Sequence, residues 1–448
     1  MHGNTDTHLP EVLFGLDPLW AATGILIATY AVIISERVNR AIIALLGAML
    51  MIWLGLLTNE QAIEGVDFNT IALLVGMMMI VAVTRKCGVF EYLAIWSAKK
   101  VKASPAGILA MLAIVTAVLS AFLDNVTTVL LVVPVTLIIT EELKIDPYPF
   151  LFSQILASNI GGTATLIGDP PNILIGTQVD LTFNDFVINL APVVVITLVF
   201  HVIAIHLLWG RSMRATAEAR ARVMAFEERR TIRDAGLLMK ALSVIALVIV
   251  CFVLARPLGI EPGAIALSGA AVLLLLDNLG KPAEQQTESV IHVFNEVEWI
   301  TIFFFVGLFI VIAGVEHAGV LSLFANKLVE LTGGDLRVTG VSILWASAVL
   351  SAVVDNIPFV ATMIPLIKSM APTFGGPEGL LPLWWALSLG ACFGGNGTLV
   401  GASANLTVAG IAERSGVRFP FVKFLKFAFP LMLAQVAIAN VYVLWRYL

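Results

Sequence analysis

The sequence predicts an all-α polytopic membrane protein. It is made of two inverted repeats, each of five spans plus one re-entrant hairpin, with broken helices at the membrane midplane. Three observations lead to this fold class. Of the 448 residues, 59% are hydrophobic and only 13% are charged, about half the ~25% charged content of a soluble domain. The apolar residues form long continuous runs, and the mean hydropathy is +0.96. The same polar motifs also occur twice.

The composition excludes several classes of protein. A lipid environment requires helices or a closed barrel, and barrel strands would give short alternating segments instead of long apolar runs. A net charge of −5 gives no sign of nucleic-acid binding. The three cysteines lie far apart in apolar context, so neither a disulfide framework nor a metal site is expected. Because no nucleophile–base or metal constellation is visible, we expect neither an enzyme nor a cofactor.

Eight apolar runs are long enough to span a bilayer, which takes roughly 17–25 residues, and four more are interrupted. The N-terminus is polar and lacks the basic start of a cleaved signal, so the first run is expected to remain as a helix. The uninterrupted runs are 17–35, 40–57, 69–86, 187–209, 237–255, 263–278, 299–315 and 427–446. The interrupted runs are 106–142, 148–178, 338–370 and 382–412, where Asp-Asn, Gly-Gly, Pro-Pro and Gly-Asn pairs predict broken helices or hairpins.

Lysine and arginine in the loops predict the orientation, because such residues favour the cytoplasmic side. Basic clusters follow the first and third spans, fill 210–236 and precede the last span. Placing all four in the cytoplasm puts both termini outside a bacterial-type plasma membrane. The segment 279–298 fits this topology poorly, since it carries one Lys and four Glu. The expected organisation is an N-terminal tail (1–16), a first repeat (17–209), a cytoplasmic linker (210–236) with a solvated surface helix, and a second repeat (237–448).

The internal repeat is visible as two pairs of aligned motifs. Residues 118–135 match 349–366 at eight of eighteen positions, and 161–172 match 394–405 at six of twelve. Five spans plus a hairpin that returns to its own side cross the membrane an odd number of times, so the second copy must be inverted. Inverted repeats with broken helices at corresponding positions are typical of secondary transporters with a substrate site at the midplane.

Each predicted hairpin carries an Asp-Asn pair, Asp124-Asn125 and Asp355-Asn356. Helix capping is one explanation, because both residues are favoured N-caps. A charge at the centre of a membrane helix nevertheless costs ~2.5–3.5 kcal/mol on insertion scales, and serine would cap without that cost. A buried carboxylate can load and release a proton, or it can coordinate Na⁺ with carbonyl and amide oxygens. We therefore expect Asp124 and Asp355 to carry the coupling ion.

The glycine motifs "SNIGGTATLIGDPPN" and "GGNGTLVGASAN" allow two interpretations. Small residues let helices pack closely in membranes. The many Asn, Thr and Ser side chains exceed what packing needs, which favours a polar cavity lined by these side chains and by exposed backbone groups. Asp169 has Ala402 as its counterpart, so any role for it would be confined to one half. The span-interior His201 and His206 are interpreted as structural.

The motifs "LDNVTTVLLVVPVT", "SNIGGTATLIGDPPNILI", "DNIPFVATMIP" and "GACFGGNGTLVGASAN" closely resemble the arsenite-permease/P-protein (ArsB/NhaD-type) branch of the ion transporter superfamily. The resemblance covers nearly the whole chain from about residue 20. It implies an inverted-repeat fold in which two hairpins and two unwound helices meet at a midplane site, and it implies a homodimer. Dicarboxylate members carry Ser-Asn-Thr at the hairpin tips. The Asp-Asn pairs of this chain favour a carboxylate-using antiporter instead.

We therefore predict a secondary active transporter with the lipid bilayer as its environment. The expected function is proton-coupled efflux of arsenite or antimonite. A sodium–proton antiporter and an anion transporter or channel are the alternatives. Neither motif segment, 118–176 or 349–410, contains His or Arg, which favours a neutral or cationic substrate. The predicted substrate-binding residues are Asn125, Thr127, Thr128, Asn159, Gly162, Thr163, Thr165, Asn172, Asn356, Gly395, Asn396, Thr398, Ser403 and Asn405.

Overall fold

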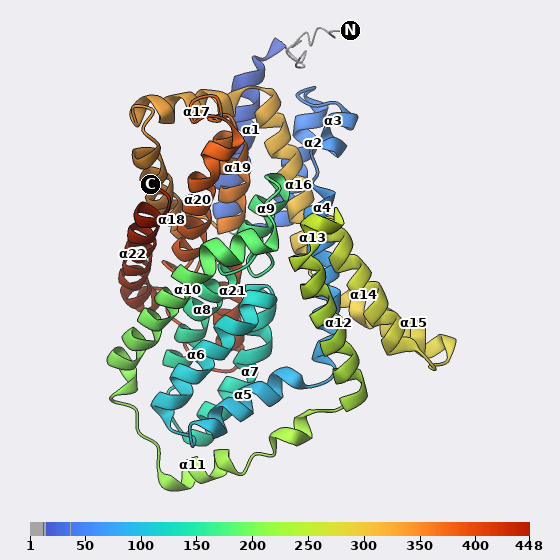
Figure 1. Cartoon of the computed structure of the whole chain (residues 1–448), viewed down its shortest axis with the longest axis vertical. Coiled ribbons are helices and arrows are strands. Elements are labelled where there is room, and N and C mark those ends of the chain that lie inside the picture. Colours follow the sequence, from blue (N-terminus) through green and yellow to red (C-terminus); the bar gives the residue numbers. More distant parts are fainter. Residues whose placement is uncertain (1–11, 13–14, 36) are drawn as a thin grey trace. The chain divides into compact units, whose positions relative to one another are not determined.

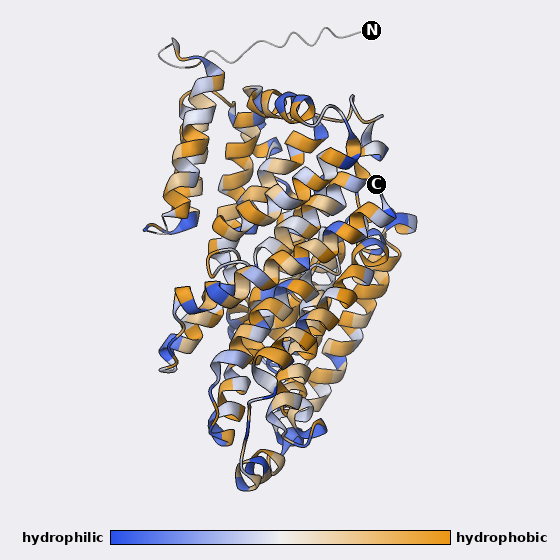
Figure 2. Cartoon of the chain, turned by 90° about the vertical axis from the view of Figure 1, so that its left-hand side faces the viewer, coloured by the Kyte–Doolittle hydropathy of each residue, from blue (hydrophilic) through white to orange (hydrophobic). Residues whose placement is uncertain are grey.

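The computed structural model describes residues 12, 15–35 and 37–448, and those residues contain helices and no strand. Most of the predicted N-terminal tail lies outside this described part. Figure 2 shows that the long helices are mostly apolar along their length, while polar residues gather in the connecting segments. The helices that are long and apolar enough to cross a membrane are 68–85, 105–122, 125–143, 183–210, 235–253, 299–317, 336–353 and 421–446. This confirms the predicted all-α membrane fold.

The longer helices follow one another in the same order in both halves, and the second half adds two four-residue helical segments. The first half consists of α1 (Pro18–Ile34), α2 (Arg40–Trp53), α3 (Asn59–Glu64), α4 (Phe68–Arg85), α5 (Val89–Lys100), α6 (Pro105–Phe122), α7 (Asn125–Leu143), α8 (Tyr148–Gly162), α9 (Pro170–Gln178) and α10 (Phe183–Ile205), which continues as a π-helical turn, η2 (His206–Gly210). The second half consists of α12 (Ala235–Val253), α13 (Ala255–Leu258), α14 (Pro262–Asn278), α15 (Ala283–Asn295), α16 (Trp299–His317), α17 (Val320–Leu331), α18 (Leu336–Val353), α19 (Asn356–Lys368), η4 (Pro377–Leu380), α20 (Leu381–Gly394), α21 (Ser403–Arg414) and α22 (Phe421–Arg446).

Each interrupted run of the sequence folds as two helices separated by a break. The hairpins α6–α7 and α18–α19 turn over two residues, at 123–124 and 354–355. The broken helices α8–α9 and α20–α21 are separated by longer stretches, 163–169 and 395–402. Proline fixes one of these boundaries, since Pro170 and Pro171 begin α9 and proline favours the first helical turn. The sequence therefore predicted both the position and the kind of interruption.

The helices pack into two compact units, each of which takes helices from both halves. One unit comprises residues 1–71, 298–339 and 361–381, and the other comprises 72–297, 340–360 and 382–448. The predicted coupling carboxylates and all the predicted substrate-binding residues lie in the second unit. The elements of this unit that position these residues are the tips of both hairpins, the two broken helices and the long helices α10 and α22 (Figure 1).

A pair of close helix crossings shows that the two halves interlock. A Cβ atom on Gly76 of α4 would lie 2.5 Å from the carbonyl carbon of Ala266 in α14. A Cβ atom on Gly307 of α16 would likewise lie 2.5 Å from the carbonyl carbon of Ala44 in α2. Gly76 and Gly307 occupy equivalent positions of the repeat, and so do Ala44 and Ala266. Each half therefore supplies one helix to the other half's crossing, and glycine is required because the backbones touch.

Several shorter helices were not predicted from the sequence. The clearest pair is α5 and α17, which follow Gly88 and Gly319 at equivalent positions of the repeat, and both glycines have left-handed backbone with φ of 76°. Each of these helices has 12 residues, which is too short to span a bilayer. Hydropathy over a span-length window therefore misses them.

The predicted linker contains the expected surface helix, α11 (Ala217–Met224), and a short 3₁₀ turn, η3 (Glu228–Thr231). This segment is tied to the base of the first hairpin. The Arg222 guanidinium donates to the Glu142 carboxylate at 3.0 Å and to the Glu142 carbonyl at 2.8 Å. Lys99 forms an ion pair with Glu228. These contacts hold the linker, α5 and the base of hairpin α6–α7 together at one end of the second packing unit.

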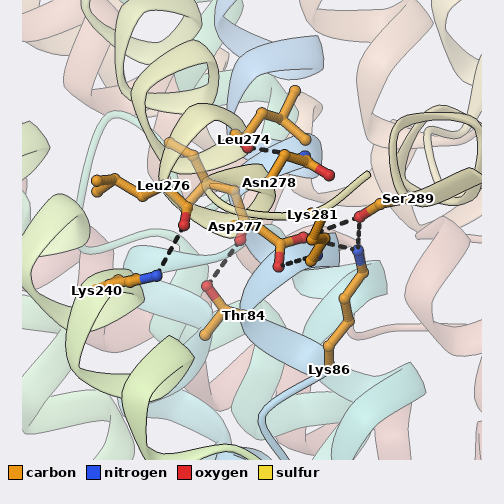
Figure 3. A network of polar contacts seen from close by, with 10 residues as sticks. Thr84, Lys86, Lys240, Leu274, Leu276, Asp277, Asn278, Lys281 and Ser289 are labelled. Atoms are coloured by element: carbon orange, nitrogen blue, oxygen red, sulfur yellow. Dashed lines mark hydrogen bonds and ion pairs between the residues drawn. The ribbon is translucent and has the colours of Figure 1, made fainter. Parts of the chain in front are cut away.

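The acidic segment 279–298 lies beside the basic end of α4. Arg85 pairs with Glu296 at 2.8 Å, and the Lys86 ammonium lies 3.1 Å from the carboxylate of Asp277, which also accepts from Lys281 and Ser289 (Figure 3). The acidic excess that fitted the predicted topology poorly is thus partly neutralised by the first half. The acidic segment and the basic end of α4 are therefore in direct contact.

Candidate functional site

The two hairpin tips present an asparagine each to a fully enclosed region. Asn125 and Asn356 are the first residues of α7 and α19, and both are buried. The neighbouring broken helix α8 is buried along its whole length, and α20 is buried from Leu383 to Gly394. A helix that is buried all round belongs to the interior of its bundle. The site is therefore built inside the second packing unit.

The predicted coupling carboxylates both cap the second arm of their hairpin. Asp124 accepts from the Thr127 amide at 2.9 Å, and its other oxygen accepts from the Thr127 hydroxyl. Asp355 accepts from the Ile357 amide at 3.1 Å and from the Ser403 hydroxyl at 2.8 Å. Both aspartates are half-buried. The capping explanation is thus realised in the structure, and it coexists with any use of the charge.

A third carboxylate, Asp169, occupies the centre of the site. It lies at the end of the unwound segment 163–169 and is completely buried. Its Oδ1 accepts from the Asn125 amide at 3.2 Å and from the Asn356 amide at 3.4 Å. Within the part of the chain that the structure describes, its Oδ2 has no hydrogen-bond partner. One carboxylate oxygen is therefore shared by the tips of both hairpins, while the other is available.

Asn159 of α8 joins this carboxylate to the second half of the chain. Its side-chain oxygen, Oδ1, accepts from the Asn125 side-chain amide at 3.1 Å. Its own amide donates to Asn396 and to Asn405, each at 3.0 Å. Asn396 in turn donates to the Gln435 side chain of α22 at 2.8 Å. A continuous chain of buried amides thus runs from Asp169 to the last helix.

The remaining predicted residues hold the unwound segments in place. Asn172 donates to the carbonyls of Thr163 and Thr165, at 3.0 and 2.9 Å. Asn405 does the same for Gly395 and Thr398 in the second half, at 2.7 and 2.8 Å. These bonds satisfy carbonyls that the broken helices leave without partners. These hydrogen bonds mainly stabilise the backbone conformation of the unwound segments.

Threonine hydroxyls attach each unwound segment to the first arm of a hairpin. Thr165 donates to the Ala121 carbonyl and Thr398 to the Ala352 carbonyl. A Cβ atom on Gly162 would lie 2.5 Å from the Gly168 carbonyl oxygen, so the segment closes on itself only because residue 162 is glycine. Hairpin and broken helix are therefore joined in the same way in both halves.

The structure brings all the predicted residues into one connected region, but at different depths. Those joined to Asp169 directly or through other side-chain amides are Asn125, Asn356, Asn159, Asn396 and Asn405. Those that cap or support are Asp124, Thr127, Gly162, Thr163, Thr165, Asn172, Asp355, Gly395, Thr398 and Ser403. Thr128 is fully buried, and its hydroxyl has no partner among the described residues.

Sequence reasoning did not place three further residues in the site. Asp169 was set aside because its counterpart is alanine. Gln435 lies in an apolar span far from the repeat motifs, where a single buried amide is the available signal. Ser388 donates to the Asn172 side chain at 2.6 Å, and nothing in its helical context distinguishes it.

The chemistry of this region is that of amides, hydroxyls and carboxylates, together with the buried thiol of Cys392, which donates to the Asn172 side-chain oxygen at 3.7 Å. Apart from Lys144 and Lys368, the motif segments contain no basic residue, and neither lysine contacts Asp169 in the described structure. Buried charges are normally paired or bound to ions. A polyvalent anion would therefore meet three carboxylates and no fixed cation here, whereas protons, monovalent cations and uncharged hydroxyl compounds face no such repulsion.

Comparison with known proteins places the chain in a transporter family. The model of the CitMHS family, described as citrate transporter, matches residues 30–390. An uncharacterized transporter of Mycobacterium tuberculosis is 43% identical over 430 residues, covering 95% of this chain and 98% of the relative. The human P protein is 32% identical over 506 residues, covering 94% of this chain and 59% of the P protein.

The fold also matches a solved structure. The crystal structure of the Alcanivorax borkumensis YdaH transporter aligns with a TM-score of 0.62 and 15% sequence identity, and covers 96% of this chain and 98% of that one. At this identity the likeness concerns the fold alone. The fold class predicted from the internal repeat is confirmed, as is the resemblance to the arsenite-permease/P-protein branch. The chain is a multi-pass membrane transporter that belongs to the CitMHS citrate transporter family of the ion transporter superfamily.

Proposed function

We propose that this protein is a proton-coupled secondary transporter that expels a small uncharged hydroxyl compound. Arsenite and antimonite, which are mostly trihydroxides at neutral pH, are the proposed substrates. The basic linker side would face the cytoplasm of a bacterial-type plasma membrane.

The observation that carries this proposal is the position of Asp169 between the two hairpin tips. An ionised carboxylate only accepts hydrogen bonds, whereas a protonated one also donates. Loading a proton on Asp169 would therefore weaken its acceptance from Asn125 and Asn356, which lie 3.2 and 3.4 Å away. Because those two amides belong to different hairpins, protonation would alter how the tips are held together. This links a proton to the moving parts of the fold.

Asp124 and Asp355 are proposed to carry further coupling charge next to Asp169. Both cap a helix through bonds that require an acceptor, so protonating either one would loosen the start of its hairpin arm. Each aspartate is half-buried, which gives it closer access to water than Asp169 has. We propose that the three carboxylates are used in succession, with Asp169 as the innermost.

The substrate would bind where buried polar atoms lack partners. A buried polar atom without a hydrogen bond costs about 1–3 kcal/mol. In the described structure such atoms include Asp169 Oδ2, the Thr128 hydroxyl and the Gln435 amide nitrogen. A compact trihydroxide can donate to Asp169 Oδ2, the one of these atoms that belongs to the carboxylate shared by the two hairpin tips. Such a ligand suits a site that lacks a fixed cation.

Sodium–proton antiport is the second candidate. It is favoured by the unwound segments 163–169 and 395–402, because backbone carbonyl oxygens outside regular helix, together with a carboxylate, are ligands that hard cations take. Citrate, for which the family is described, would need its own neutralising cation in this site. An anion channel would show flux without any proton dependence.

The proposal is tested with purified protein in liposomes that contain a pH dye. A proton gradient is imposed, and arsenite, antimonite, Na⁺, Li⁺ or citrate is added in turn. Proton movement triggered by arsenite or antimonite alone supports the proposal. A response to Na⁺ or Li⁺ alone supports the second candidate. A response to citrate alone, or arsenite flux without proton movement, contradicts the proposal.

A further inference from the structure

One face of α7 carries a row of buried polar residues that leads away from the site. Asn125, Thr128, Thr136 and Thr140 recur at helical spacing, with Val132 as the one apolar member of the row. Their exposed fractions are 3%, 0%, 0% and 1%. Residues three and four apart lie on the same side of a helix, so this row extends from the hairpin tip nearly to the C-terminal end of α7 at Leu143.

The neighbouring helix α8 adds polar groups to the same row. The Gln154 amide donates to the Thr136 hydroxyl at 2.8 Å. The Gln154 carbonyl oxygen and the Thr128 hydroxyl have no partner among the described residues, although both are buried. Such atoms are commonly satisfied by ordered water. The row therefore has two places where water would complete its hydrogen bonds.

The outer end of this row reaches a cavity of about 540 Å³. Thr140, Glu141 and Pro134 of α7 line it on one side, and Ile411 and Ser415 line it on the other. Glu141 and Ser415 are exposed, so the cavity reaches the surface of the protein. An exposed carboxylate at this position can collect protons from solution.

The equivalent positions of the second half are apolar. At the offset that relates Asp124 to Asp355, Thr128 corresponds to Phe359, Thr136 to Ile367 and Thr140 to Ala371. At the offset that relates Asn172 to Asn405, Gln154 corresponds to Leu387. The inverted repeat would otherwise give both sides the same lining. Only the first copy of the repeat therefore has polar residues at these positions, and packing alone does not require them there.

We infer that the polar face of α7, completed by Gln154, is a one-sided proton path between the cavity at Thr140 and Asp169. The path deepens the proposed function and rests on it for the identity of the transported ion. The side that it serves is the side of the linker, because Arg222 binds Glu142 next to the cavity. Protons would exchange with this side along α7 and would require a rearrangement to reach the other side.

The proton would move along water held by the threonine hydroxyls and the glutamine. Each hydroxyl accepts one proton and passes on another, so the side chains are unchanged after a transfer. The proton ends on Asp169 Oδ2, which turns the carboxylate into a carboxylic acid. Every other O–H bond that forms along the path is matched by one that breaks, so the net change is one proton taken from solution and bound at Asp169.

Thiol labelling tests whether water reaches this face. Thr140→Cys, Thr136→Cys and Thr128→Cys are made with Cys251→Ser, because Cys251 is the native cysteine that is partly exposed. Vesicles of known orientation are treated with a membrane-impermeant methanethiosulfonate. We expect all three to react from the linker side and none from the other side. Ile367→Cys, at the apolar counterpart position, should not react. A reactive Thr140→Cys with unreactive Thr136→Cys and Thr128→Cys would show that access ends at the cavity and would overturn the inference.

Proton flux tests the use of the path. Thr136→Val and Gln154→Leu keep the shape and remove the hydrogen bonds. We expect substrate-driven proton flux to fall about tenfold, which corresponds to ~1.4 kcal/mol in the barrier, with substrate affinity unchanged. Thr84→Val is the matched control, because Thr84 is also a buried threonine on a spanning helix that donates to the carbonyl four residues before it. Unchanged flux in both path variants would contradict the inference. A wild type that moves no protons would instead contradict the proposed function, while the labelling result would still decide whether the path exists.

Discussion

Two carboxylates of the same packing unit, Asp169 and Asp277, are almost equally buried and are held in opposite ways. Asp277 is paired with the Lys86 and Lys281 ammonium groups at 3.1 and 2.8 Å (Figure 3). Asp169 accepts from two neutral amides and keeps one oxygen without a partner in the described structure. Lysine pairing fixes the charge of Asp277, since losing it would leave two cations behind. Nothing of that kind holds the charge of Asp169.

The difference separates a structural carboxylate from one that a transporter can use. A buried ion pair keeps its carboxylate ionised and fixes the geometry around it, which suits the junction of α4, α14 and α15. A carboxylate among amides can gain or lose a proton with only a rearrangement of hydrogen bonds. The positions of the two residues fit this division, because Asp277 lies in the last turn of α14, whereas Asp169 lies between α8 and α9, the two parts of one broken helix.

The largest effect is expected at Asp169. Asp169→Asn keeps the size of the side chain and removes its ability to bind a proton. Coupled transport in liposomes should drop to the level of protein-free vesicles, while the melting temperature in detergent stays near that of the wild type. Retained coupling in this variant would remove Asp169 from the proposed mechanism.

Asp124→Asn and Asp355→Asn should each abolish or strongly reduce coupled transport as well. Asparagine is also a favoured N-cap, so each hairpin arm should still begin at its present residue and the fold should be retained. Transport and circular dichroism are measured on the same preparation. Full coupled activity in both variants would mean that these aspartates serve as caps only.

A stability effect without a transport effect is expected at Asp277. Asp277→Asn leaves Lys86 and Lys281 close together without compensation. Breaking a fully buried pair costs ~3–5 kcal/mol, and about 1–3 kcal/mol is expected here because the two lysine side chains are 23% and 34% exposed. The variant should therefore melt earlier and still transport. Loss of transport at unchanged melting temperature would contradict the comparison.

The smallest effect is expected at Gln435. Gln435→Leu removes the acceptor of the Asn396 amide, and a lost partner of this kind costs about 1–3 kcal/mol. Substrate affinity should weaken several-fold with the maximal rate nearly unchanged, since Gln435 acts through Asn396 and Asn159. Gln435→Glu, which keeps an acceptor for that amide, should restore most of the affinity.

Much of this arrangement follows from the sequence because it depends on local rules. Apolar run length predicted the spans, the Asp-Asn pairs predicted the hairpin tips, and the repeated glycine motifs predicted the broken helices. The pairing of Asn125 and Asn356 on one carboxylate could not be predicted, since it joins residues of different halves through side-chain geometry. The internal repeat gave no indication of a role for Asp169, because the equivalent residue in the second half is Ala402.

Gln435 and the polar face of α7 show a related limit. Gln435 contacts the site only through the packing of α22, which no local motif encodes. Thr128, Thr136 and Thr140 lie inside an apolar run, where threonine is common and barely lowers hydropathy. Their position on one face of α7 indicates a path only when the cavity and Gln154 are known to lie beside that face.

Counting the protons released on substrate binding tests whether Asp169 is the innermost coupling group. Arsenite or antimonite is added to the purified transporter in weakly buffered detergent solution, and the pH change is followed for the wild type and for Asp169→Asn. The account predicts release of about one proton per bound substrate in the wild type and none in the variant, with binding still detectable. Equal proton release by both proteins would contradict the assignment of Asp169 as the innermost coupling group.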